Sequence, residues 1–151
     1  MNILNSEQTP MGEALAKHVL SRETGLNPSR IGILRDEYGK PYLPGHAVHF
    51  NLSHSGGLVL LAVSELGEIG CDVEDATRTV RNPEAVRRKI AQPGEEEVPL
   101  FELWVKKEAV YKAGGPGRVY YPAMPEGYIA AVCCRADEEA AEAEEVFLNA
   151  A

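Results

Sequence analysis

The sequence contains few of the residues that build a disulfide framework or a thiolate metal site. Its cysteines, Cys71, Cys133 and Cys134, are odd in number and form no C-x-x-C pair. The start of the chain does not read as a signal peptide, and no stretch approaches the roughly 18 apolar residues of a membrane span. No internal repeat is present. We therefore expect a cytoplasmic globular protein rather than a disulfide-stapled secreted domain or a membrane protein.

An excess of positive charge is also lacking. The formal net charge is −8, and six acidic residues between positions 137 and 145 supply most of it, so the rest of the chain is nearly neutral. A nucleic-acid-binding protein would normally present a strongly basic face. One basic segment stands out, because five of the residues 78–89 are Lys or Arg and only Glu84 opposes them. This segment is either a solvated helix face or a surface for a phosphate or an acidic partner.

The rest of the composition is that of a globular domain, because 44% of the 151 residues are hydrophobic and 25% are charged. Residues 11–24 have the spacing of an amphipathic helix, with Met11, Leu15, His18 and Val19 on one side. A short strand is predicted at 31–34. Three further apolar runs separated by turns predict an antiparallel meander that the helix covers, and these runs are 48–52, 58–64 and 69–74.

The second half begins with the basic segment, where Asn82 and Pro83 predict a helix start. A longer helix is predicted at 97–113, and strands are predicted at 119–121 and 128–134. The sequence therefore predicts an α+β fold in two small halves that act as one functional unit, 1–74 and 75–135, followed by an acidic, solvated tail at 136–151.

Two carboxylates share one face of the strand predicted at 69–74. Alternate residues of a strand point the same way, so Asp72 and Glu74 lie side by side. Their Cα atoms would be roughly 6.5 to 7 Å apart, a spacing that lets both reach one Mg²⁺ ion. An ordinary polar strand face explains the same pattern.

The helix at 97–113 places charged residues in an apolar stripe. Leu100, Trp104, Glu108 and Lys112 follow one another at helical spacing, while the opposite face carries Glu102, Lys106, Ala109 and Ala113. Burying a Glu and a Lys costs desolvation. Either these two side chains pair with each other, or they line a site that needs ions, and we favour the site.

The predicted hairpin tip, residues 53–57, contains His54 between two serines. A hydrolase triad is rejected because no G-x-S-x-G elbow is present. A zinc site of His46, His49 and His54 would have irregular spacing and no fourth ligand. Hydroxyl and amide donors in a Gly-rich tip suit phosphate contact. Lys40, between Gly39 and Pro41, is a fixed cation or a solvated loop lysine.

Four blocks of the sequence, in this order, resemble the Sfp-type 4'-phosphopantetheinyl transferases, which move phosphopantetheine from coenzyme A onto a serine of a carrier protein. The last two blocks are the most specific, and the resemblance runs from about residue 11 to residue 134. The blocks are Glu37-Tyr38-Gly39-Lys40-Pro41-Tyr42-Leu43, Phe50-Asn51-Leu52-Ser53-His54-Ser55, Ile69-Gly70-Cys71-Asp72-Val73-Glu74, and Trp104-Val105-Lys106-Lys107-Glu108-Ala109 with Lys112 and Gly115.

The resemblance implies a fold of two pseudo-two-fold-related halves, each an antiparallel sheet packed by helix, with the active site between them. It implies that Asp72, Glu74 and Glu108 bind Mg²⁺ on the coenzyme A diphosphate, with Glu108 also accepting the serine proton. Lys112 would stabilise the departing 3',5'-ADP. The remaining coenzyme A contacts implied are Lys107 at the pyrophosphate, His54 at the 3'-phosphate and Lys40 at the nucleotide end, and Ser53 is a further coenzyme A-binding residue.

The implied partners are coenzyme A and an acyl or peptidyl carrier protein, which would dock on the basic segment. Compared with the family, the sequence is short before its first helix and in its last sheet. Either an oligomer supplies the missing surface, as in the smaller trimeric holo-acyl-carrier-protein synthases, or coenzyme A binding is weaker. The alternative function is a degenerate, non-catalytic relative that binds the carrier protein or coenzyme A without turnover.

Overall fold

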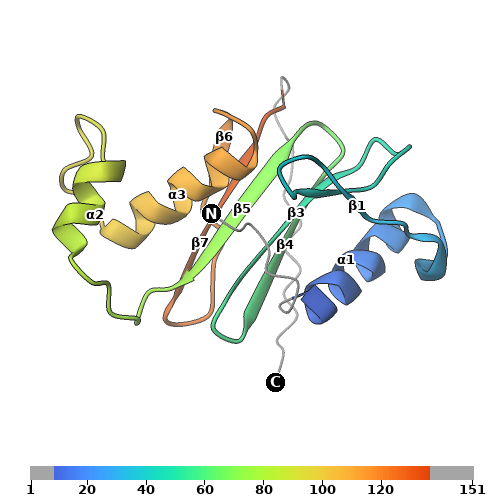
Figure 1. The fold of residues 1–151 in the computed structure, drawn as a ribbon, viewed down its shortest axis with the longest axis horizontal. Coiled ribbons are helices and arrows are strands. Elements are labelled where there is room, and N and C mark those ends of the chain that lie inside the picture. The colour runs from blue at the N-terminus through green and yellow to red at the C-terminus, as the bar shows by residue number, and fades with distance from the viewer. Residues whose placement is uncertain (1–8, 137–151) are drawn as a thin grey trace.

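The computed structural model describes residues 9–136 and has the predicted α+β architecture (Figure 1). Helix α1 lies on one side of the strands, while α2 and α3 lie on the opposite side. The strands form small antiparallel sheets. The elements are α1 (Thr9–Thr24), the 3-10 turn η2 (Pro28–Arg30), β1 (Leu34–Arg35), β2 (Pro41–Tyr42), β3 (His49–Ser55), β4 (Leu58–Ser64), β5 (Ile69–Asp75), α2 (Pro83–Ile90), α3 (Leu100–Lys112), β6 (Arg118–Tyr120) and β7 (Tyr128–Cys134).

Helix α1 forms where it was predicted but buries a different face. Leu15 and Val19 are buried as expected, whereas Met11 is 52% exposed and His18 is exposed. A Cβ on Gly12 would lie 3.7 Å from the Leu52 side chain, so the helix turns its small residues toward the β3–β4 hairpin. Residues with small side chains let the helix lie closest to the hairpin. The buried face of the helix is therefore rotated from the predicted one toward these residues.

The strand predicted at 31–34 is wrong in its bounds. Residues Pro28–Arg30 form a 3-10 turn in which the Asn27 side chain accepts from the Ser29 N–H, and the strand begins only at Leu34. The hairpin tip is also shorter than predicted. β3 pairs with β4 as far as Ser55↔Leu58. Ser53, His54 and Ser55 therefore belong to the strand, and only the two glycines form the turn.

The predicted meander is wrong, because β5 does not continue the β3–β4 sheet. It pairs with β7 in a three-stranded sheet of order β5-β7-β6. On its other edge, side chains of β3 take the place of backbone partners. Asn51 Oδ1, Ser53 Oγ and Ser55 Oγ accept hydrogen bonds from the backbone N–H groups of Cys71, Val73 and Asp75 at 2.9, 3.1 and 2.9 Å.

We call these three contacts the side-chain ladder. Residues 51, 53 and 55 alternate along β3 and therefore share one face, which is why they meet three alternate amides of β5. Both strands advance in the same direction along the ladder. The ladder joins the two sheets, and Figure 1 shows β3 and β5 next to each other.

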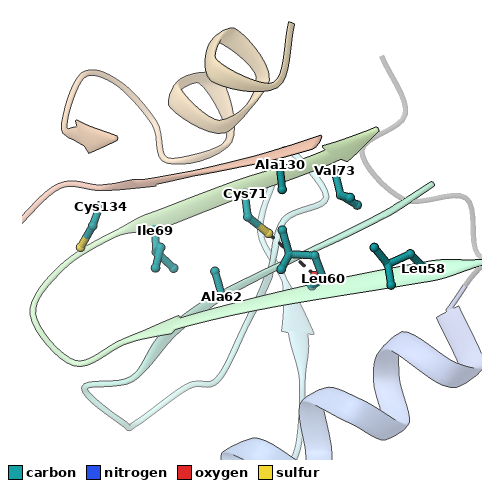
Figure 2. Close-up of a cluster of buried hydrophobic side chains, with 8 residues drawn as sticks. All are labelled: Leu58, Leu60, Ala62, Ile69, Cys71, Val73, Ala130 and Cys134. Atoms are coloured by element: carbon teal, nitrogen blue, oxygen red, sulfur yellow. Dashed lines mark hydrogen bonds between the residues drawn. The ribbon is translucent and has the colours of Figure 1, made fainter. Parts of the chain in front are cut away.

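An apolar core fills the space between the two sheets. Leu58, Leu60 and Ala62 of β4 face Ile69, Cys71 and Val73 of β5, with Ala130 and Cys134 of β7 at the border (Figure 2). Burial raises the pKa of the Cys71 thiol to about 12, so this cysteine is a protonated core residue. The side chains of the ladder thus lie next to an apolar core.

Helix α3 lies unusually close to β5. A Cβ on Gly70 would lie 2.3 Å from both the Ala109 carbonyl oxygen and the Ala113 nitrogen, so only glycine fits here. Ala109 and Ala113, predicted on the exposed face, are therefore buried, together with Leu103 and Val105. The predicted stripe lies instead at the border of the buried face, where Leu100, Trp104 and Glu108 are partly exposed and only the Lys112 side chain is buried.

The second half otherwise follows the prediction closely. Asn82 caps α2, and its side chain accepts from the Ala85 N–H. β7 has the predicted bounds, and β6 is displaced by one residue. The predicted acidic tail, 136–151, lies outside the described residues except for residue 136. No helix within residues 9–136 is long and apolar enough to cross a membrane.

Candidate active site

A buried ion pair connects β5 to the end of α3. The Lys112 ammonium lies 3.1 Å from Asp72 Oδ1 and donates also to the Cys71 carbonyl oxygen at 3.1 Å. Both side chains are at most 8% exposed. Ser53 Oγ donates to the same Asp72 oxygen at 3.2 Å. Of the two alternatives for Lys112, a pair within its own helix is wrong, because the ammonium pairs with Asp72 on β5. The alternative that Lys112 lines a site stays a prediction.

Asp72 is the most strongly perturbed carboxylate of this group. Burial raises its pKa to about 6, while the Lys112 ammonium acts in the opposite direction, and the negative charges of Glu74 and Glu108 raise it further. Its second oxygen, Oδ2, is buried and has no hydrogen-bond partner among the described residues. An unpartnered buried acceptor is costly, so a ligand at this oxygen would stabilise the site.

Glu74 lies two residues farther along the same strand, as predicted. Its Oε2 accepts from Ser55 Oγ at 3.4 Å and from Arg78 Nε at 3.3 Å. The Arg78 guanidinium in turn lies over the rings of Phe101 and Trp104, 5.0 and 5.8 Å from their centroids. Glu74 is therefore held by a cation that is itself stacked on α3.

Glu108 is half-buried on α3. Burial raises its pKa, the Lys112 ammonium lowers it, and Glu74 raises it. The three acids Asp72, Glu74 and Glu108 thus act on one another electrostatically. Within residues 9–136 no three or more His, Cys, Asp or Glu side chains are gathered closely enough to hold a metal ion. The predicted ligand set is therefore a neighbourhood of acids and not a preformed cage.

The other predicted site residues are engaged within the protein. Lys40 Nζ donates to the carbonyl oxygens of Ile69 and Lys112 and to Glu68. Lys107 Nζ lies 3.1 Å from Glu95 Oε2. His54 lies on β3 opposite Val59 and is partly exposed.

Sequence reasoning missed three residues that hold the site side chains in place. Asn51 is fully buried in the side-chain ladder, and Arg78 holds Glu74. Glu95 bonds both Lys106 and Lys107 and the Gln92 N–H, and these bonds lower its pKa to about 2. The alternation of Asn51, Ser53 and Ser55 in an otherwise apolar strand could have indicated the ladder. Nothing in the run of glutamates 95–97 distinguishes its first member.

Comparisons with known proteins identify what the chain is similar to. The sequence model of the family described as "4'-phosphopantetheinyl transferase, N-terminal" matches residues 6–66. A 4'-phosphopantetheinyl transferase of Bacillus subtilis is 31% identical over 122 residues, which are 75% of this chain and 54% of the relative. The Sfp protein of Bacillus subtilis strain 168 is 33% identical over 123 residues, again 75% of this chain and 54% of the relative.

The chain is similar in sequence to the Sfp-type 4'-phosphopantetheinyl transferases. A second group of relatives agrees, because the 4'-phosphopantetheinyl transferase AcpT of Salmonella typhimurium strain LT2 is 34% identical over 90 residues, 52% of this chain and 47% of the relative. The chain spans about half the length of the curated relatives it matches.

The four blocks that resemble this family meet in the structure. The first runs through β2 to Leu43, the second is most of β3, the third is most of β5, and the fourth lies in α3 except for Gly115. The ladder joins the second block to the third, Lys112 joins the third to the fourth, and Lys40 joins the first to both of these. The family blocks are therefore parts of one hydrogen-bonded assembly.

Proposed function

We propose that this protein transfers 4'-phosphopantetheine from coenzyme A to a serine of an apo carrier protein and releases 3',5'-ADP. The observation that carries the proposal is the buried Asp72–Lys112 pair next to Glu74 and Glu108, in a chain similar in sequence to 4'-phosphopantetheinyl transferases. An acid cluster with one embedded ammonium suits a reaction that moves negative phosphate oxygens past one another.

The donor chemistry of the site fits a magnesium ion. Carboxylate oxygens are the ligands that Mg²⁺ takes, and the unpartnered Oδ2 of Asp72 is available for one. Asp72, Glu74 and Glu108 would hold the ion, with Glu74 released from Arg78. When bound, Mg²⁺ would offset the negative charge of the diphosphate during transfer.

Glu108 is the residue that we assign as the base. Its pKa is raised and is therefore closer to neutral pH than the pKa of an exposed glutamate, which suits a carboxylate that accepts a proton. The serine hydroxyl of the carrier gives up its proton to Glu108, directly or through water, as its oxygen forms a bond to phosphorus. The bond from that phosphorus to the 3',5'-ADP oxygen breaks in the same step.

Lys112 is assigned to the departing 3',5'-ADP. An ammonium has three N–H donors, and Lys112 uses two of them, on the Cys71 carbonyl and on Asp72. The third can meet a phosphate oxygen. Asp72 keeps the ammonium charged and oriented, so removal of either partner would leave an uncompensated buried charge.

Coenzyme A and the carrier protein are assigned to different residues around this centre. His54 and Lys107 are assigned to coenzyme A, with Lys107 exchanging Glu95 for pyrophosphate. Ser53 is also assigned to coenzyme A. Its hydroxyl already donates to Asp72 and accepts from the Val73 N–H. The basic segment, including the exposed Arg88 and Lys89 of α2, is the proposed docking surface for an acidic carrier.

We also propose that residues 1–74 and 75–135 act as two pseudo-two-fold-related halves of one functional unit. The packing supports this, because α1 covers the β3–β4 hairpin and α3 covers β5 and β7. In each case a helix with small residues at its contact face lies on an antiparallel pair. β5 belongs by sequence almost entirely to the first half and pairs with β7 of the second half, so the β5–β7 pairing joins the two halves.

A non-catalytic binding protein is the second candidate. The observation that favours it is the pairing of Glu74 with Arg78, which engages one of the three acids that a transferase would use for Mg²⁺. Such a protein would bind coenzyme A or the carrier and leave both unchanged.

Intact-mass spectrometry of apo carrier proteins incubated with this protein and coenzyme A tests the proposal. We expect a gain of one phosphopantetheine with Mg²⁺ and none with EDTA. Asp72→Ala and Lys112→Met should abolish the gain, whereas Glu65→Ala, in an exposed turn, should keep it. Calorimetry with coenzyme A separates the two candidates, because binding without any gain of mass on any carrier would favour the binding protein.

A further inference from the structure

Side chains supply hydrogen-bond partners to most of the edge of β5 that faces β3. Its N–H groups donate to the ladder residues of β3. Two of its carbonyl oxygens accept from ammonium groups, because Ile69 O accepts from Lys40 at 2.8 Å and Cys71 O accepts from Lys112 at 3.1 Å. Lys40 and Lys112 therefore donate to two successive carbonyl oxygens on the same edge of β5.

Lys40 differs from Lys112 in having no donor left. Its ammonium donates to Ile69 O at 2.8 Å, to Lys112 O at 2.8 Å and to Glu68 Oε2 at 3.1 Å, and its side chain is only 15% exposed. Three acceptors account for all three N–H bonds of an ammonium. A phosphate could reach Lys40 only by displacing one of these acceptors.

The turn before Lys40 is built to hold this ammonium in place. Asp36 Oδ1 accepts from the N–H groups of Tyr38 and Lys40, each at 2.9 Å. Gly39 has φ 82°, a conformation that glycine adopts at no steric cost. Pro41 then fixes the backbone at the start of β2. Lys40 thus projects from a constrained turn.

The acceptor that Lys40 takes on α3 is the carbonyl of Lys112 itself. This carbonyl is one of the last in the helix, where the helix dipole is negative and a cation is favourable. Lys40 therefore holds the backbone of the residue whose side chain reaches Asp72. The same ammonium ties that backbone to Ile69, three residues before Asp72 on β5.

We infer that Lys40 is a positioning residue for Lys112 and not a ligand of coenzyme A. It fixes the end of α3 against the start of β5, so that the Lys112 ammonium stays on Asp72 with one donor facing outward. The kinetic part of this inference rests on the proposed transfer activity, and the structural part does not.

A kinetic comparison separates a positioning role from a binding role. Lys40→Met should lower kcat for transfer at least tenfold and change KM for coenzyme A less than twofold. The matched control is Arg35→Gln, which removes a single bond to the Gly39 carbonyl in the same turn and should leave both constants unchanged. A tenfold rise in KM with kcat retained, or a tenfold loss of coenzyme A affinity by calorimetry, would overturn the inference.

A second measurement needs no turnover. With ¹⁵N-lysine labelling, the ammonium signals of Lys40 and Lys112 should both be visible, because buried, bonded ammonium protons exchange slowly. Coenzyme A should shift the Lys112 signal and leave the Lys40 signal in place, whereas a shift of Lys40 would contradict the inference. If the protein transfers nothing, loss of the Lys112 signal in Lys40→Met still supports positioning, and its persistence refutes it.

Discussion

Replacing Ser53 by alanine should destabilise the fold more than its single hydroxyl suggests. Ser53 is 5% exposed, and its Oγ both accepts from the Val73 N–H and donates to Asp72. Val73 is fully buried, so water cannot replace the missing acceptor. A buried donor left without a partner costs about 1 to 3 kcal/mol, and the bond to the carboxylate adds to this. We expect a loss of about 2 to 3 kcal/mol in the free energy of unfolding.

The same substitution at two other serines provides a comparison for the size of this loss. Ser55 makes the equivalent pair of bonds to Asp75 and Glu74, but it is only partly buried, so Ser55→Ala should cost about 1 kcal/mol. Ser29→Ala removes an exposed hydroxyl and should stay within about 0.5 kcal/mol of the wild type.

Urea unfolding followed by far-ultraviolet circular dichroism measures all three variants. The slope with denaturant should stay constant, because the surface exposed on unfolding does not change. An effect of Ser53→Ala below about 0.5 kcal/mol, or one smaller than that of Ser55→Ala, would refute the reasoning that the ladder holds the two sheets together.

Three further outcomes follow from the packing and charge of the site. Gly70→Ala places a Cβ 2.3 Å from backbone atoms of α3 and should cost about 3 kcal/mol or more, whereas Gly57→Ala, with open space around it, should be near neutral by urea unfolding. Because the pKa of Asp72 is raised to about 6 in the folded state, the folded protein binds this proton more tightly than the unfolded chain does. Without divalent cations, stability should therefore fall as pH rises from about 4 to 6, and Asp72→Asn should remove that part of the slope. Arg78→Ala uncovers the ring of Trp104, the sole tryptophan, so fluorescence emission should move to longer wavelength, and an unchanged spectrum would argue against the stacked geometry.

The secondary structure was largely predictable because local patterns determine it. β7 is a continuous apolar run bounded by glycine, and the Asn82-Pro83 start of α2 is a local capping signal. The sheet pairing of β5 was not predictable in this way. A short turn after β4 favoured a meander, but polar residues on β3 already satisfy the edge of β5, which leaves β5 to pair with a strand about sixty residues later.

The candidate site shows the same division. Strand alternation and helical spacing singled out Asp72 and Lys112, the family resemblance assigned their roles, and the structure brings the two side chains together. The helix pattern alone chose the wrong face of α3, because it ranks side chains by apolarity. Contact with Gly70 instead favours Ala109 and Ala113, whose small size lets the helix approach the strand. The bonds of Lys40 join residues far apart in sequence, and no local pattern encodes them.

The two edges of β5 give this strand an unusual property in hydrogen exchange. The amides of Cys71, Val73 and Asp75 are protected by side chains of β3. The alternate amides of Gly70, Asp72 and Glu74 instead face the backbone of β7, with which β5 is paired. The first set can exchange when the sheets separate, and the second only when β5 leaves its own sheet. Alternate residues of one strand thus report two different opening motions, and their relative rates would show how readily the joint beneath the ion pair opens.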